Sequence, residues 1–362
     1  MALQPDVATA REGKSALGAA IFAGLTTNAM LAKRRRREHF HKASAGRASD
    51  ARGRAATSPG EIPGRGWWDI LMRAKDDVSR NNLSLIAAGA AFYGFLAIPS
   101  AITGLVSLYG LAFDPRGVQR QVEAMRGLLP DEAIRLISEQ LQTLAAHSNS
   151  TLGVGLVASL ALALWSARSG ISSMITALNI VYGEDEKRGY LRLQLAALSL
   201  TAGAVLSALI ALSLIAVLPA VLDLAPLGSA GKTIASAIRW PILIALVTVA
   251  LAVIYRFAPS REEPKWRWVS WGAVAATLLW IIASALFSLY VGRFASYDKS
   301  YGSLGAVVVL LMWLYLSAFV VLFGAQLNAE IEHQTARDST TGRWRPLGQR
   351  GALMADTVGA ER

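Results

Sequence analysis

One arginine lies in an unexpected place, near the middle of a long apolar run. Arg168 stands in the stretch ALWSARSG within residues 152–182, where most neighbours are Leu, Val, Ala, Ile and Gly. A charged side chain at the centre of a membrane span costs about 2.5–3.5 kcal/mol on insertion scales, so it must face protein, water or a ligand. Three roles are open to it: an arginine that locks helices through backbone carbonyls, a site for an anion or lipid headgroup, or a side chain that reaches the membrane surface.

The surroundings of Arg168 are typical either of ordinary close packing between membrane helices or of an interrupted helix. Small and hydroxyl-bearing residues follow it in SARSGISS, and the runs 83–113 and 152–182 are both longer than a membrane span requires. Pro99 should kink the first of them. Transporters often build substrate sites from interrupted helices at mid-depth, although kinks and small residues also serve ordinary packing. We predict a central cavity or ligand site formed by Arg168, Ser166, Ser169, Pro99 and Tyr93.

Composition indicates which elements must position this site. The chain has 362 residues, 53% of them hydrophobic and only 17% charged, whereas soluble domains carry about 25% charged residues. Several apolar runs exceed the ~20 residues that cross a hydrocarbon core. We therefore predict an all-α, polytopic membrane bundle of six transmembrane helices. Their ranges are roughly 83–113, 152–182, 194–222, 238–257, 268–292 and 303–328.

Three regions divide the chain. Residues 1–65 are basic and low in apolar residues, and we expect them to be mostly disordered, with an Ala- and Gly-rich run at 15–32 that is either a weak span or a surface helix. Residues 66–333 form the membrane domain. Residues 334–362 are expected to be a disordered cytoplasmic tail.

Basic residues in the connections set the orientation. The segment 33–82 carries thirteen Lys and Arg, including KRRRR, and the tail after residue 330 carries five. The positive-inside rule then places both ends of the six-span core in the cytoplasm of an inner membrane. The basic N-terminal segment should attract anionic lipid headgroups. No nucleic acid is expected as a partner, because that stretch offers one aromatic residue for stacking.

Amphipathic segments accompany the spans. Residues 66–80 carry an apolar stripe and should form an interfacial helix, and residues 115–146 should form an extracytoplasmic one. The outer loop at 295–303 is dense in Tyr and charge. We expect this loop to be ordered. It is either a turn stabilised by its tyrosines and its ion pair, or a gate, formed by Tyr297, Asp298, Lys299 and Tyr301, that covers the cavity.

Catalytic constellations are not evident. The chain has no cysteine, so it has no thiolate nucleophile or cysteine metal site. The four histidines are not clustered with carboxylates in the way that a metal-dependent nuclease needs. We expect no cofactor, no metal site and no enzymatic activity.

Several motifs resemble those of the YihY/BrkB family of bacterial inner-membrane proteins, which carries an old ribonuclease BN label. They are YGSLG followed by WLYLSA and GAQLNAE in residues 255–332, ALNIVYGEDEKRG at 177–189, and AAFYGFLAIPS at 90–100. The resemblance covers about residues 67–333 and implies six spans with both termini cytoplasmic. It does not supply a settled activity.

The sequence therefore leaves two classes of function open. One is a role in transport or envelope maintenance that moves an amphiphile or anionic solute, and the other is a non-transporting membrane scaffold. A hydrated or lipid-accessible cavity at Arg168 would favour the first, and a tightly packed dry core would favour the second. The substrate and the oligomeric state are not specified by any motif.

Overall fold

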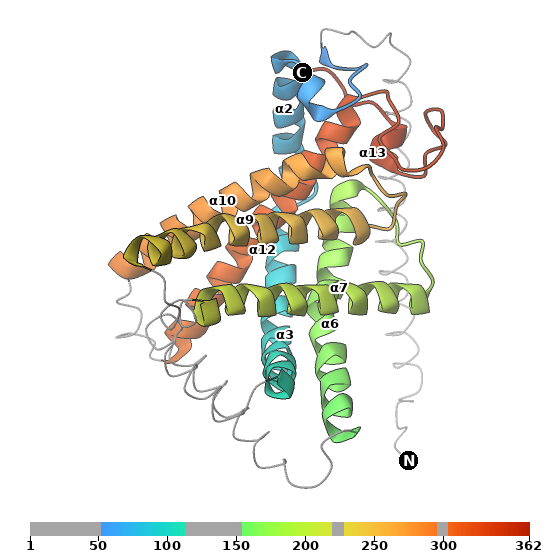
Figure 1. Cartoon of the computed structure of the whole chain (residues 1–362). Helices are drawn as coiled ribbons and strands as arrows, with labels where there is room; N and C mark the ends of the chain where they lie inside the picture. Colours follow the sequence, from blue (N-terminus) through green and yellow to red (C-terminus); the bar gives the residue numbers. More distant parts are fainter. Residues whose placement is uncertain (1–51, 113–153, 219–227, 295–302) are drawn as a thin grey trace, which may run out of the picture.

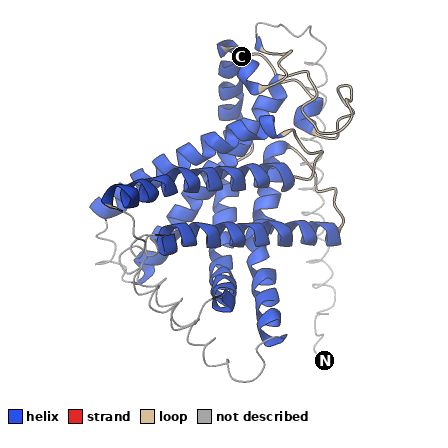
Figure 2. Cartoon of the chain, viewed as in Figure 1, coloured by secondary structure: helices blue, strands red, loops and turns tan. Residues whose placement is uncertain are grey.

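Helices make up the regular structure of the computed structural model, which describes residues 52–112, 154–218, 228–294 and 303–362 (Figures 1 and 2). In chain order they are η2 (Pro59–Glu61), α2 (Gly64–Arg80), α3 (Leu83–Ala112), α6 (Val154–Tyr182), α7 (Tyr190–Leu212), η3 (Ser213–Val217, a π-helical turn), α9 (Ser229–Phe257), α10 (Trp266–Phe294), α12 (Ser303–Gln334) and α13 (Leu353–Asp356). The only strand-like pairing in these ranges is one bridge between Pro264 and Thr340. The predicted all-α class is confirmed for this part of the chain.

Five of the described helices are long and apolar enough to cross a membrane. They are α3, α7, α9, α10 and α12, and each overlaps a predicted span. The sixth predicted span, 152–182, coincides with the 29-residue helix α6, which is not among the five. A multi-pass membrane protein is therefore supported, and the count of six spans stays a prediction.

Helix α12 occupies the centre of the arrangement. It contacts α2, α3, α6 and α10, while α3 and α6 form the most extensive helix pair (Figure 1). Close packing against α10 depends on glycine: a Cβ atom at Gly272 would lie 2.4 Å from the carbonyl oxygen of Gly324. Small residues at helix crossings are the common way in which membrane helices approach closely.

The buried core lies toward one end of this bundle. It gathers the beginning of α3 and α10 and the last turns of α6, α9 and α12, with Leu178, Tyr255 and Leu322 fully or almost fully buried. Toward the other end of α9 and α10, large apolar side chains such as Ile238, Trp240 and Leu289 are exposed. Exposed apolar side chains on long helices are what contact with lipid tails requires.

A polar cap covers the core end. We define it as residues 52–81, 183–189, 258–265 and 335–362, together with the last three turns of α12. The expectation that residues 334–362 form a disordered tail is wrong, because this segment contains the fully buried Thr335, Ser339 and Arg350. The expectation of disorder up to residue 65 is also wrong for residues 52–65, since Arg54 and Ile62 are buried. Long-range hydrogen bonds hold both segments in place.

Helix α2 differs from the interfacial helix predicted at 66–80. Its extent agrees, but Asp69, Arg73 and Asp77, spaced four residues apart, are buried against protein, whereas Leu71, assigned to the apolar stripe, is 45% exposed. Charged and apolar side chains of α2 both pack against protein: Ala74 is fully buried and Val78 packs on the core, while α12 supplies partners for the charged residues. Contact of α2 with a lipid surface stays a prediction.

Other predicted features lie outside the described residues. These are the apolar run at 15–32, the amphipathic segment at 115–146, and the outer loop with Tyr297, Asp298, Lys299 and Tyr301. Each of these expectations stays a prediction.

Candidate functional site

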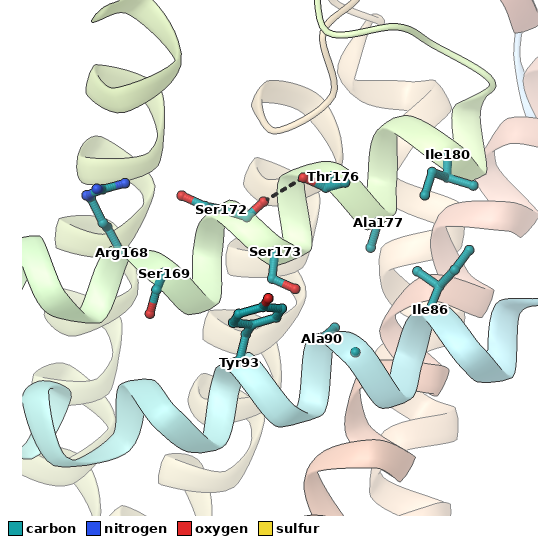
Figure 3. Close-up of a pocket in the computed structure, with 11 residues that line it drawn as sticks. Ile86, Ala90, Tyr93, Arg168, Ser169, Ser172, Ser173, Thr176, Ala177 and Ile180 are labelled. Atoms are coloured by element: carbon teal, nitrogen blue, oxygen red, sulfur yellow. Dashed lines mark hydrogen bonds between the residues drawn. The ribbon is translucent and has the colours of Figure 1, made fainter. Parts of the chain in front are cut away.

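A cavity of about 530 Å³ lies between α3 and α6 (Figure 3). Helix α6 gives it a polar wall, because Arg168, Ser169, Ser172, Ser173 and Thr176 follow helical spacing along one side. Helix α3 contributes a mainly apolar wall. Its lining residues are Ile86, Gly89, Ala90 and Tyr93. Ala177 and Ile180 of α6 also line the cavity, which therefore offers hydroxyl groups and one cation within a mainly apolar lining.

Small residues bring the two helices together beside this cavity. A Cβ atom at Gly170 would lie 3.3 Å from the Cβ of Ala97 and 3.5 Å from the Cα of Gly94. The polar side chains of α6 that line the cavity lie beside this contact between Gly170 and α3. Both helices are continuous there: α3 runs through Pro99, and α6 runs through Arg168. Of the two alternatives for SARSGISS, an interrupted helix and ordinary close packing, the continuous helix α6 excludes an interruption at Arg168.

Arg168 is partly buried and stacks on its neighbour Trp165, with the guanidinium carbon 4.1 Å from the ring centroid. Its Nε atom is buried and has no hydrogen-bond partner. No hydrogen bond or ion pair of Arg168 occurs among the described residues. Carbonyl groups from a broken helix do not satisfy this arginine, because α6 keeps its carbonyls in its own helical bonds. Its charge is thus available to the cavity.

The structure brings together three of the five predicted site residues. Arg168, Ser169 and Tyr93 all line the cavity, and Figure 3 shows the Tyr93 ring reaching from α3 toward Ser173 of α6. Pro99 lies farther along α3 and is not part of the lining. The Ser166 side chain lies outside the described part of the structure.

Three hydroxyl-bearing lining residues were not among the predicted site residues. Ser172, Ser173 and Thr176 extend the polar wall by two helical turns, and the Thr176 hydroxyl donates to the Ser172 carbonyl oxygen at 3.1 Å (Figure 3). Their spacing of three to four residues after Arg168 and Ser169 was a readable signal that they share one helix face. From the sequence, the serines were interpreted as small residues near Arg168, in either a close-packed or an interrupted helix.

A second polar cluster, in the polar cap, was missed by sequence reasoning. Helix α12 carries polar residues at every fourth position: Gln326, Glu330 and Gln334. They contact Arg73 and Asp77, which are also four residues apart on α2. Arg73 donates from Nε to Glu330 at 2.6 Å and from Nη2 to the Gln334 side chain at 2.7 Å. Gln326 donates to Asp77 at 3.3 Å. The motif GAQLNAE therefore provides contacts between α12 and α2 in the polar cap.

Loops of the cap are joined in the same manner. Asn179 accepts a hydrogen bond from the Ser260 backbone N–H at 2.7 Å and donates to Glu186 at 3.0 Å. Burial disfavours the charged form of Glu186, but hydrogen bonds from Arg188 and Asn179 outweigh this and lower its pKa to about 2. Arg350 donates to four backbone carbonyls, those of Arg345, Arg337, Ala355 and Ala336. Because these bonds use all three guanidinium nitrogens of Arg350, this arginine has a structural role.

Long apolar helices, a partly polar cavity between two of them and a cap of buried ion pairs define a polytopic helical membrane protein. The family model described as Virulence factor BrkB matches residues 74–346. Because this match covers more than half of the chain, the protein belongs to that family. The resemblance predicted from the sequence motifs is confirmed.

Named relatives agree with this assignment. A protein of Bacillus subtilis (strain 168), described only as ribonuclease-like (YfkH), is 31% identical over 250 residues, which is 67% of this chain and 88% of that protein. A UPF0761 membrane protein of Rhodospirillum centenum is 26% identical over 85% of this chain and 66% of its own length. One from Idiomarina loihiensis is 35% identical over 27% of this chain and 34% of its own length. No solved structure matches.

Proposed function

We propose that this protein serves transport or envelope maintenance by binding an anionic amphiphile or solute in the cavity between α3 and α6. The observation that carries the proposal is the state of Arg168: a partly buried cation in a polar-walled cavity, with no hydrogen-bond or ion-pair partner among the described residues. Keeping a charge at such a site has a cost. An anionic ligand would supply the missing partner.

The chemistry of the polar wall suits an oxyanion. The guanidinium presents several donors in a planar fork that matches phosphate and carboxylate groups. The hydroxyls of Ser172 and Ser173 add further donors within the same cavity. Stacking on Trp165 holds the guanidinium in one orientation, and the apolar wall of α3 accommodates hydrocarbon. A ligand with an anionic group and an apolar portion therefore fits better than a purely polar one.

Two alternatives receive less support. A non-transporting scaffold would be expected to have a dry, close-packed interface at Arg168, and the cavity argues against that. Ribonuclease-like is a description of the Bacillus subtilis relative; in the part of this chain that the structure describes, no three His, Cys, Asp or Glu side chains gather where they could hold a metal ion. We propose a non-enzymatic function.

Orientation and location follow from charge. We propose an inner membrane location with the polar cap on the cytoplasmic side, where the basic segment 33–82 meets anionic lipid headgroups. The cysteine-free chain allows single cysteines to test this in intact cells. Gly60→Cys and Arg343→Cys should resist an impermeant maleimide, and Arg120→Cys should react with it. Reaction at Gly60→Cys from outside would reverse the proposed topology.

The decisive experiment compares charge variants at Arg168. Purified protein in detergent is titrated with phosphatidylglycerol, and the rise in melting temperature is measured against phosphatidylcholine. We expect a selective response to phosphatidylglycerol that Arg168→Met abolishes and Arg168→Lys reduces, because lysine keeps the charge but loses the fork. Arg239→Met is the matched control, since Arg239 also stacks on a neighbouring tryptophan, Trp240 at 5.3 Å, but lies outside the cavity.

A transport readout separates the two functional classes. In liposomes, movement of a fluorescent phosphatidylglycerol analogue between leaflets is followed by dithionite quenching. The proposal expects movement with the wild type and the Arg239→Met control, and its loss with Arg168→Met. A stable Arg168→Met protein that responds to phosphatidylglycerol as the wild type does would end the binding hypothesis. Binding without any movement would favour the scaffold.

A further inference from the structure

An exposed tryptophan lies between two arginines in the polar cap. Trp344 is 72% exposed in the loop GRWRPLG, residues 342–348, which we call the Trp344 loop. Arg343 and Arg345 flank it, and both are exposed. Leu347 of the same loop is 39% exposed, so the loop presents two apolar side chains and two cations outside the packed cap.

The base of this loop is firmly held. The backbone N–H of Arg345 donates to the buried carboxylate of Asp338 at 2.9 Å, and Arg350 donates to the Arg345 carbonyl at 3.1 Å. Gly342 and Gly348 adopt positive φ values of 94° and 87°, which glycine accepts without strain. The fold therefore presents Trp344 outward through a fixed turn.

The position of the loop relates it to the membrane surface. Residues 339–341 run antiparallel to residues 263–265, with the Lys265 N–H bonded to the Ser339 carbonyl and the Thr341 N–H to the Glu263 carbonyl, both at 2.8 Å. Residue 265 immediately precedes α10, which begins at Trp266. Phe257, at the end of α9, and Trp266 are 40% and 48% exposed, as expected for aromatic residues at headgroup depth.

Charge in this region favours an anionic surface. Arg343, Arg345 and Arg267 are exposed, whereas the carboxylates of this region, Glu262 and Glu263, are partly exposed. Each of these carboxylates has an arginine partner, at 3.4 Å from Arg345 and 2.9 Å from Arg256. The region keeps a positive excess around an exposed indole ring. Tryptophan flanked by arginine is the combination that settles at the boundary of anionic bilayers.

We propose that the Trp344 loop docks on the bilayer surface, with the indole of Trp344 at headgroup depth and Arg343 and Arg345 on the phosphates of anionic lipids. The inference concerns a peripheral contact and does not depend on a ligand in the α3–α6 cavity. It gives the ordered C-terminal segment a function: to anchor the polar cap against the membrane beside α9 and α10.

Site-directed spin labelling tests the docking. Leu347→Cys, in the otherwise cysteine-free chain, carries the label and leaves Trp344 in place. Collision with oxygen and with a water-soluble nickel chelate reports depth in nanodiscs of phosphatidylethanolamine and phosphatidylglycerol. We expect the label to favour oxygen there. A label at Glu361→Cys, whose side chain is 55% exposed elsewhere in the cap, is the control and should favour the nickel chelate.

Further variants identify the cause of the docking. Trp344→Ser should move the Leu347 label into water. Arg343→Gln should lower the ratio of immersed to aqueous label about fivefold, from roughly 1 kcal/mol per basic residue near an anionic surface. Nanodiscs of phosphatidylcholine alone remove the attraction for both arginines and should lower the ratio about 25-fold. A Leu347 label as water-accessible as the Glu361 label overturns the proposal. An immersed label that Trp344→Ser and Arg343→Gln both leave unchanged also overturns it.

Discussion

Two arginines of the polar cap, Arg73 and Arg350, differ from the arginine of the cavity, Arg168, in what surrounds them. Arg73 donates to Glu330, Gln334 and the Ala360 carbonyl, and every guanidinium nitrogen of Arg350 donates to a backbone carbonyl. Arg168 has one stacking contact and a buried Nε atom without a partner. The first two act as cross-links whose hydrogen-bonding capacity is used within the chain. The third keeps that capacity for something else.

This contrast separates structural from functional buried charge in the protein. A buried arginine is evidence of function only when the fold leaves its donors open, because a saturated arginine has no means to bind a ligand without breaking the structure. The cap and the cavity should therefore respond in opposite ways to the same substitution, arginine to methionine.

The largest effect is expected at Arg73. Arg73→Met leaves Glu330, which is 1% exposed, without its main ion-pair partner. Removing one member of a buried pair costs about 3–5 kcal/mol, so the melting temperature in nanodiscs should fall strongly. The double variant Arg73→Met with Glu330→Leu should recover most of that loss. If Arg73→Met melts like the wild type, the cap is not cross-linked through this ion pair.

An intermediate effect is expected from Glu186 and depends on pH. Its pKa in the fold is about 2, below the value of 4.5 expected for the unfolded chain. A lowered pKa stabilises the fold fully above about pH 4.5 and loses that contribution as the pH falls toward about 2. The side chain is 26% exposed, so we expect a contribution of roughly 2 kcal/mol at neutral pH.

Glu186→Gln measures this contribution. The gap in melting temperature between wild type and variant should be widest near neutral pH and should narrow as the pH is lowered below about 4.5. Glu262→Gln, at a carboxylate 42% exposed, is the control and should show little such narrowing. A gap that stays constant with pH would mean that the Arg188 and Asn179 contacts do not stabilise the ionised carboxylate.

The smallest effect on stability is expected at Arg168. Arg168→Met removes one contact with Trp165, worth about 0.5–1 kcal/mol when partly exposed, and also removes the cost of a charge in a membrane span. The melting temperature without added lipid should therefore change little, while the response to phosphatidylglycerol disappears. A loss of stability close to that of Arg73→Met would make Arg168 a helix-locking residue and would remove the contrast between the two regions.

Local pattern was enough to determine the helices. The predicted runs 268–292 and 303–328 match α10 (Trp266–Phe294) and α12 (Ser303–Gln334), because length and hydropathy alone define an apolar span. The same reasoning located Arg168 and its neighbour Ser169 in the cavity wall, since a charge in an apolar run is conspicuous in any sequence. Tyr93 joined them through a family resemblance on α3.

Tertiary structure decided what the polar residues do. The C-terminal segment is as polar as a disordered tail, and its order depends on Arg350 and on contacts such as Arg54 with the Gly359 carbonyl, 305 residues away. Arg73 and Glu330 are separated by 257 residues. No local periodicity specifies which charge meets which, because an ion pair forms only after the helices that carry it have packed. Whether the hydrogen-bond donors of an arginine are used within the chain or left free is therefore decided by the tertiary structure.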